Sequence, residues 1–216
     1  MIERTIDIVL PWVNPSDPKW QEERNAYSGE KLSTSDSREI RFRDWDNLQY
    51  LFRGIEKYAP WVRKIHFITY GHIPKWLNVD HSKINIVNHK DFIPAEYLPT
   101  FSSHVIELNM HRIKGLSENF IYFNDDIFII DKLKENDFFQ NGLPCDSLAS
   151  TLIVPKAGTF SPILFNTVAC INRHFDKRTS MKKKKYLWFN PSTGNNPLTF
   201  VTLSPSSLQK HRIGDR

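Results

Sequence analysis

Short apolar runs at four places along the chain predict buried β-strands. Residues 6–10 form the first run, which ends at a proline. Residues 64–70 alternate between polar and apolar side chains and close on a glycine, which indicates a second strand. Residues 84–87 and 120–123 are the third and fourth, and the last of them continues directly into three polar residues.

Two segments between these runs have the apolar periodicity of an α-helix. The first lies between Asp44, a good N-cap residue, and Pro60, which ends it. Its apolar face consists of Leu48, Leu51, Phe52, Ile55 and Tyr58. The second predicted helix covers residues 104–113, is capped by Ser102 or Ser103, and stops before a glycine.

The alternation of strands with helices predicts an α/β fold with a mainly parallel sheet and flanking helices, of the nucleotide-binding kind. Residues 13–37 are polar and rich in proline, serine and aspartate, so we expect a long loop there. Residues 131–216 are less regular. We therefore expect a core in residues 1–130, and an irregular basic part in residues 131–216 that belongs to the same domain.

Composition narrows the class of protein. The 216 residues are 40% hydrophobic and 25% charged, which is typical of a globular protein with one core. No apolar stretch approaches the ~20 residues of a transmembrane helix, and the N-terminus has no signal-peptide core. Two cysteines, Cys145 and Cys170, are too few for a disulfide scaffold. We expect a reduced, cytoplasmic protein.

The net charge of +5 is concentrated at the C-terminal end. Residues 173–216 carry ten basic and two acidic side chains, whereas the rest of the chain is slightly acidic. This distribution disfavours nucleic acid as a partner, because nucleic-acid binding needs basic residues spread over a face. Residues 182–185 are four lysines followed by aromatic residues, which suits contact with anionic lipid headgroups or with a growing polyanionic product, while a solvated loop is the alternative.

The fourth predicted strand leads into Asn124, Asp125 and Asp126. Ligands of open α/β sheets bind beyond the carboxyl ends of the strands. A carboxylate pair at that place can hold a hard divalent cation such as Mg²⁺ or Mn²⁺, which neutralises diphosphate oxygens. The alternative is that these residues only form a turn.

The predicted helix 104–113 carries a second group of candidates. Glu107 and His111 are i,i+4 neighbours, and a glutamate beside a histidine can act as a general base. Arg112 adds a guanidinium group whose shape matches phosphate. An ordinary solvated face with one i,i+4 pair is the alternative.

The loop after the first strand and the start of the first helix are further candidates. Trp12 and Asn14 lie where a nucleotide base and ribose bind in such sheets, although Trp12 could equally pack in the core. Arg41 and Arg43 precede the helix and suit an anion, while capping by Asp44 explains that segment as well. No dinucleotide, P-loop or serine-hydrolase motif is present.

Two long phrases resemble a known family. They are RFRDWDNLQYLFRGIEKYAPWVRKIHFITYGHIPKWLN from residue 41 and NHKDFIPAEYLPTFSSHVIELNMHRIKGLSENFIYFNDD from residue 88. The opening IDIVLPWVNPSDPKW is similar to the first block of the same family, and residues 175–191 to its capsule-synthesis members. The chain thus resembles the Stealth family of sugar-phosphate transferases.

The resemblance implies transfer of a sugar 1-phosphate from a UDP-sugar to a hydroxyl of an oligosaccharide or polysaccharide acceptor, with release of UMP. Bacterial members build phosphodiester-linked capsule polymers in this way. It also implies a glycosyltransferase-A-like, nucleotide-sugar-binding core and a divalent cation, Mg²⁺ or Mn²⁺.

The resemblance further implies roles for residues that match the family's motifs. The metal residues would be Asp125 and Asp126. The catalytic residues would be Glu107, Asp126, His111 and Arg112. Nucleotide contacts would be made by Asp7, Trp12 and Asn14, with Asn124 beside the metal.

Two alternatives stay open from the sequence. A conventional metal-dependent glycosyltransferase would use the same donor, attack the anomeric carbon and release UDP. The family's later block, with a His-x-Pro phrase and a further arginine, is not found in this chain. An inactive relative that binds a nucleotide-sugar without turnover is therefore the second alternative.

Overall fold

The structure is a computed structural model, and it describes residues 5–28, 44–145, 150–151, 166, 169–170, 173, 199–200 and 206–209. The chain divides into two units. The first contains residues 1–146 and 205–216, and the second contains residues 147–204. In the second unit the structure describes an antiparallel pair, β7 (Ser150–Thr151) with β8 (Thr199–Phe200).

A five-stranded sheet in the order β3-β2-β1-β4-β9 forms the centre of the first unit. The strands β1 (Ile6–Pro11), β2 (Ile65–Thr69), β3 (Ile84–Asn88) and β4 (Asn119–Tyr122) are parallel to one another. The fifth strand, β9 (Ser206–Gln209), pairs with β4 in antiparallel orientation. The predicted α/β fold with a mainly parallel sheet is confirmed, and the four predicted strands are present within about one residue of their expected bounds.

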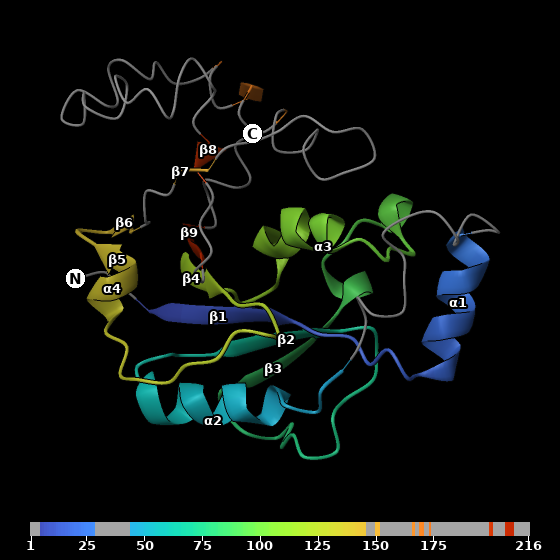
Figure 1. Cartoon of the computed structure of the whole chain (residues 1–216), viewed down its shortest axis with the longest axis horizontal. Helices are drawn as coiled ribbons and strands as arrows, with labels where there is room; N and C mark the ends of the chain where they lie inside the picture. Colours follow the sequence, from blue (N-terminus) through green and yellow to red (C-terminus); the bar gives the residue numbers. More distant parts are fainter. Residues whose placement is uncertain are drawn as a thin grey trace. The chain divides into compact units, whose positions relative to one another are not determined.

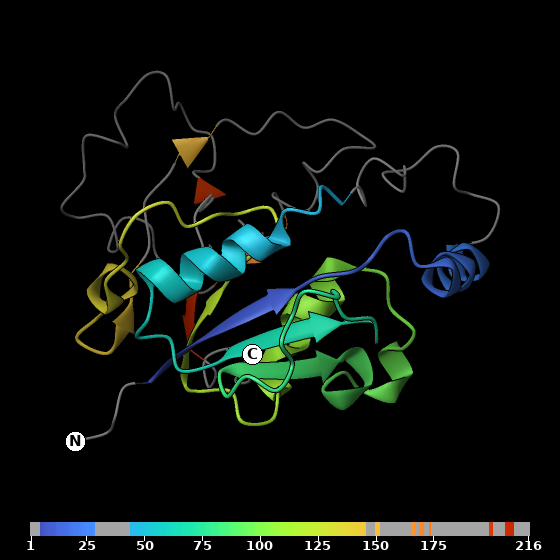
Figure 2. The same ribbon diagram turned by 90° about the horizontal axis from the view of Figure 1, so that it is seen from below.

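One face of this sheet is covered by α2 (Leu48–Tyr58), as Figures 1 and 2 show. Alternate residues of β1 point to this face, because successive side chains of a strand point to opposite sides. Ile6, Ile8 and Leu10 pack there in one buried cluster with the apolar side of α2. Gly54 of α2 lies close to the backbone of Ile129, where a Cβ atom would approach the carbonyl oxygen to 2.9 Å.

The opposite face of the sheet is covered by α3 (Ser103–Asn109) and a short 3-10 helix that follows it (Met110–Arg112). Val9, Ile68 and Phe120 point to this side and are fully buried with Met110 and its neighbours. Two further 3-10 helices, His89–Asp91 and Ala95–Tyr97, lie between β3 and α3.

Three local predictions differ from the structure. The expected loop at residues 13–37 contains α1 (Pro18–Ser28), which begins where the Asp17 side chain accepts a hydrogen bond from the Trp20 amide (2.8 Å). The helix expected after Asp44 begins only at Leu48, because the Asp44 side chain binds the Asp46 amide in a turn (2.7 Å). The predicted helix 104–113 is α-helical only to Asn109.

The remaining described part of the first unit is small. A short helix, α4 (Glu135–Phe138), leads into the antiparallel strands β5 (Phe139–Gln140) and β6 (Leu143–Pro144). Cys145 and Cys170 are both thiols. Among the residues that the structure describes, no helix combines the length and the apolar character needed to cross a bilayer. The prediction that residues 131–216 belong to one catalytic domain with the core stays a prediction.

Candidate functional site

The candidate chemistry collects at the carboxyl edge of the parallel strands. Because β1 to β4 are parallel, the segments that follow Pro11, Thr69, Asn88 and Tyr122 all emerge at the same edge of the sheet. The loop after β1 and the acidic residues after β4 belong to this edge, and β1 and β4 are hydrogen-bonded neighbours. The fold therefore brings the first and last sequence candidates to adjacent strand ends.

The acidic pair follows β4 directly. Asn124, Asp125 and Asp126 are all exposed at the surface. Partial desolvation and the charge of Asp126 raise the pKa of the Asp125 carboxyl from 3.8 to about 6. Asp44, just before α2, adds a smaller contribution in the same direction. The start of α2 therefore lies close to the acidic pair, which concentrates negative charge at this strand end.

Tyr122 joins the acidic pair to α3. Its hydroxyl donates a hydrogen bond to Oε1 of Glu107 (3.1 Å). Burial raises the pKa of the Tyr122 phenol, and the charges of Glu107 and the two aspartates raise it further. The phenol thus stays protonated and holds the Glu107 carboxylate near Asp125 and Asp126. Sequence reasoning missed Tyr122, although it is the last residue of a strand whose end was already a candidate.

His111 and Arg112 lie on the 3-10 helix that continues α3. His111 is half-buried, whereas Arg112 is exposed. The change from α-helix to 3-10 helix after Asn109 alters the i,i+4 geometry that the sequence predicted for Glu107 and His111. The hydrogen bond that fixes Glu107 comes from the neighbouring strand.

The loop after β1 is held by aromatic packing and by a histidine. Trp12 stacks on Phe67, with 5.7 Å between ring centroids, and meets the ring of His72 edge-on at 5.3 Å. The Asn14 amide donates a hydrogen bond to Nε2 of His72 (2.6 Å), and Oδ1 of Asn14 accepts one from Ser16 (3.0 Å). Trp12 is half-buried, so part of its side chain packs in the core and part is exposed.

Two histidines, His72 and His89, lie at this edge of the sheet. Burial lowers the pKa of His72, although the charge of Asp17 acts in the opposite direction. Burial lowers the pKa of His89 from 6.5 to about 4, and the neighbouring His72 adds to the effect. His89 also contacts the ring of Tyr70 edge-on at 5.5 Å. Both are therefore neutral imidazoles near pH 7, placed beside the Trp12 loop.

Asp7 was predicted to contact nucleotide, but the structure places it in the core. Its side chain is fully buried near the amino end of β1, on the α3 side of the sheet. Nε of Arg63 (2.9 Å), Nε2 of His66 (3.0 Å) and the backbone amide of Ser117 (2.8 Å) surround its carboxylate. No surface of Asp7 is left for a ligand, because all of it lies under neighbouring residues.

The pKa of Asp7 reflects these partners. Burial alone would raise it, but hydrogen bonds from His66, Arg63 and a backbone amide outweigh burial and lower the pKa from 3.8 to about 2. Asn85 completes the network from β3 by bonding to Nδ1 of His66 (2.8 Å). The network links the amino-terminal parts of β1, β2 and β3, so its role is structural.

The metal prediction rests on two carboxylates. Within the described ranges, the structure brings no three histidine, cysteine or acidic side chains together in a metal-binding arrangement. Asp125 and Asp126 fit a cation in chemical type, since carboxylate oxygens are preferred by Mg²⁺ and Mn²⁺ and a cation would relieve their repulsion. Arg41 and Arg43 lie outside the described residues.

Comparison with known proteins gives the context for this site. The family model for Stealth protein conserved region 2 matches residues 41–145, and that for conserved region 1 matches residues 4–32. Every described candidate residue named above lies within these two regions.

Three relatives illustrate the similarity. A capsular polysaccharide phosphotransferase, WcwK, from Streptococcus pneumoniae is 49% identical over 190 residues, which are 88% of this chain and 57% of the relative. The capsular polysaccharide phosphotransferase eps5J of Streptococcus thermophilus is 42% identical over 191 residues, 88% of this chain and 80% of the relative. An exopolysaccharide phosphotransferase, cps2G, from Lactiplantibacillus plantarum is 41% identical over 201 residues, which are 93% of this chain and 58% of the relative.

The chain therefore spans less than two thirds of the length of WcwK and cps2G, but four fifths of eps5J. Identity above 40% over most of this chain, together with both conserved-region matches, shows its family. This protein belongs to the Stealth family.

Proposed function

We propose that this protein is a phosphotransferase that moves a sugar 1-phosphate from a UDP-sugar to a hydroxyl of a growing polysaccharide, in capsule or exopolysaccharide synthesis. The observation that carries the proposal is the hydrogen bond of Tyr122 to Glu107 beside Asp125 and Asp126. It is made in a chain that is similar to polysaccharide phosphotransferases. A base and a pair of carboxylates at one strand end are the parts that such a transfer needs.

The proposed reaction is a displacement at phosphorus. The oxygen of the acceptor hydroxyl forms a bond to the β-phosphorus of the UDP-sugar, and the bond from that phosphorus to the bridging oxygen breaks. UMP leaves with the bonding electron pair, and the hydroxyl proton passes to the Glu107 carboxylate. Tyr122 orients this carboxylate through its hydrogen bond, so that the free oxygen can accept the proton.

Other residues of the site would bind the nucleotide and stabilise the transferred phosphoryl group. Arg112 is exposed on the 3-10 helix that follows α3 and would steady the transferred phosphoryl group, while half-buried His111 would support the base. Trp12 and Asn14 would contact the nucleotide from the adjacent strand end, with Asn124 beside the acidic pair. Asp125 and Asp126 would hold Mg²⁺ or Mn²⁺, which would neutralise diphosphate charge when bound.

Product analysis tests this function. The protein is incubated with UDP-N-acetylglucosamine or other UDP-hexoses, Mg²⁺ or Mn²⁺, and an oligosaccharide acceptor, and UMP is separated from UDP by anion exchange. Acceptor-dependent UMP supports the proposal. UDP would instead identify a conventional glycosyltransferase, and nucleotide-sugar binding with neither product would identify an inactive relative.

A pair of variants ties the result to the site. Asp126→Ala should abolish UMP release while the far-ultraviolet circular dichroism stays unchanged. Asp131→Ala removes another exposed carboxylate of the segment after β4 and serves as the matched control. Turnover in Asp126→Ala equal to that of the control would refute the role of the acidic pair.

The proposed place of action is the cytoplasmic face of the inner membrane, where a nucleotide-sugar donor and a polysaccharide acceptor would meet. The lysines at 182–185, which lie outside the described residues, would provide peripheral contact with anionic lipid. Sedimentation with anionic vesicles at low salt, abolished when the four lysines are replaced by glutamine, is the expected result.

A further inference from the structure

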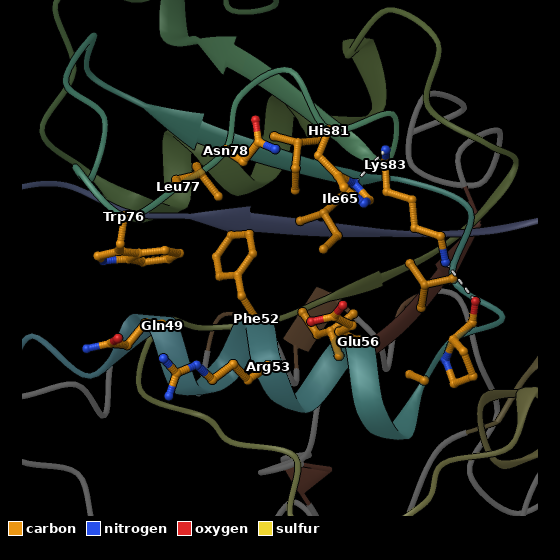
Figure 3. A pocket seen from close by; sticks show the side chains of 15 residues that line it. Gln49, Phe52, Arg53, Glu56, Ile65, Trp76, Leu77, Asn78, His81 and Lys83 are labelled. Carbon is orange, nitrogen blue, oxygen red and sulfur yellow. Dashed lines mark hydrogen bonds between the residues drawn. The ribbon is translucent and has the colours of Figure 1, made fainter.

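A groove runs beside α2, on the side of the sheet opposite to α3. It has a volume of about 490 Å³ and lies between α2 and the segment that joins β2 to β3 (Figure 3). Ile65 and Ile84, at the starts of β2 and β3, form part of its apolar floor. Trp76 and Gln49 lie at one end of the groove, and Lys83 lies toward the other.

An aromatic ring forms one wall of the groove. Trp76 keeps 36% of its surface exposed. It meets Phe52 edge-on, with 5.2 Å between ring centroids, and Phe52 in turn contacts Phe67 at 5.6 Å. Phe67 stacks on Trp12, which belongs to the candidate site. A continuous row of rings therefore connects the Trp76 end of the groove with the carboxyl edge of the sheet.

The groove follows the length of α2. Gln49 is on the first turn of α2, whereas Pro60 lies just beyond its other end. The groove therefore extends over about 16 Å, the length of the 11 residues of the helix.

Polar groups line the rim of the groove. Gln49 and Asn78 provide side-chain amides that both donate and accept hydrogen bonds. In Figure 3, Gln49 lies at the Trp76 end of the groove, and Asn78 lies on the side opposite to α2. Arg53 and Lys83 place two positive charges along the rim against one negative charge from Glu56. The Lys83 ammonium is anchored by a hydrogen bond to the carbonyl oxygen of Pro60 (2.7 Å).

We propose that this groove binds the polysaccharide itself, as a phosphodiester-linked saccharide segment that lies several sugars away from the reacting hydroxyl. The proposal rests on the proposed function, because it assigns the groove to the acceptor of that reaction. A sugar ring offers an apolar face of C–H groups to Trp76 and a rim of hydroxyls to Gln49 and Asn78. The phosphodiester charge complements Arg53 and Lys83.

Binding is measured first, without any UDP-sugar. The protein is run in native gels that contain phosphodiester-linked bacterial capsular polysaccharides, with neutral dextran as the comparison. We expect retardation by members of the phosphodiester-linked panel and a loss of affinity of about tenfold or more in Trp76→Ala, as for truncated aromatic anchors. Tyr97→Ala removes another exposed ring outside the groove and should bind normally. Equal binding by wild type and Trp76→Ala, or no retardation by any member, would overturn the proposal.

A charge variant tests the rim separately. Arg53 is exposed, so Arg53→Glu should fold normally, which circular dichroism verifies. We expect it to weaken binding to the phosphodiester-linked polymers and to reduce their salt dependence. Binding that is unaffected by Arg53→Glu would overturn the electrostatic part of the assignment.

Kinetics then link the groove to the acceptor. In Trp76→Ala, KM for a long acceptor should rise about tenfold, whereas KM and kcat for a monosaccharide acceptor should stay unchanged. An equal change for both acceptors would refute a distal saccharide site. If no UMP is released by any form, the proposed function fails, while the gel measurement still decides whether the groove binds saccharide.

Discussion

Replacing Asp7 by asparagine separates a structural role from a nucleotide-binding role. The substitution keeps the size of the side chain but removes the negative charge from a fully buried position. Arg63 and His66 then lose the carboxylate to which they donate. If Asp7 bound nucleotide, its replacement would leave the free energy of unfolding almost unchanged. If Asp7 belongs to a core ion pair, its replacement would lower the free energy of unfolding.

The expected loss of stability in Asp7→Asn follows from the lowered pKa of Asp7 and from the free-energy cost of leaving its partner's charge unpaired. The lowering of the Asp7 pKa from 3.8 to about 2 corresponds to about 2 kcal/mol of native-state stability at neutral pH. Breaking a buried pair leaves its partner uncompensated, which costs about 3–5 kcal/mol. Because the Arg63 side chain is 36% exposed and water can solvate it, we expect a loss of about 3 kcal/mol.

The assay is urea and thermal unfolding followed by tryptophan fluorescence. A loss of about 3 kcal/mol should lower Tm by roughly 6–12 °C for a domain of this size. Asp80→Asn is the matched control, since Asp80 is exposed between β2 and β3 and its replacement should change stability by less than about 0.5 kcal/mol. If Asp7→Asn weakened UDP binding without lowering Tm, the structural assignment would be wrong.

The pH dependence of the stability difference between wild type and Asp7→Asn gives a second measurement. A carboxyl group with a lowered native pKa stabilises the protein above its unfolded pKa, and this contribution is lost as the pH falls through the native value. The stability difference between wild type and Asp7→Asn should therefore be constant from pH 7 to about 5. It should shrink between about pH 4 and pH 2. A difference that persisted at pH 2 would contradict the assigned pKa.

Three further predictions concern the site and the packing of α2. Tyr122→Phe removes the hydrogen bond to Glu107 and should lower kcat about 10- to 100-fold with unchanged circular dichroism, measured by UMP release. Asp126→Asn removes the neighbouring charge but leaves the desolvation, so carboxyl NMR titration should find the pKa of Asp125 lowered from about 6 without reaching its ordinary value; an unchanged value would contradict charge coupling. Gly54→Ala would place a Cβ atom 2.9 Å from the Ile129 carbonyl oxygen and should lower stability by about 1–3 kcal/mol, visible as a lower Tm.

Most of the sheet could be predicted from the sequence because each of its parallel strands is a short apolar run or alternates between apolar and polar side chains. The strands β1, β2 and β4 are buried almost throughout, and such strands show few polar interruptions, whereas β3 is only partly buried and alternates. By contrast, α1 was predicted as a loop, since its residues are mostly polar and proline and aspartate precede it. The antiparallel β9 was also missed, because pairing of residues 206–209 with β4 depends on contacts distant in sequence.

The candidate site was predictable where residues follow a strand. Asp125 and Asp126 come directly after β4, and parallel strands place such residues at a ligand-binding edge. The partner of Glu107 was not predictable, because helical spacing favoured His111 whereas the hydrogen bond comes from Tyr122 on β4. Side chains from different elements meet through packing, which spacing within one helix does not describe.

Asp7 and Asp125 show why residue type within a matched region does not determine role. Asp7 lies within β1 and Asp125 follows β4, and the pKa of Asp7 is lowered to about 2 whereas that of Asp125 is raised to about 6. Asp7 is buried among donors, so its charge is already neutralised and serves stability. Desolvation and the neighbouring charge of Asp126 both disfavour the charged form of Asp125, so an incoming cation would stabilise that charge. The surroundings of each carboxylate, rather than its place in the family pattern, assign one to the fold and the other to the proposed chemistry.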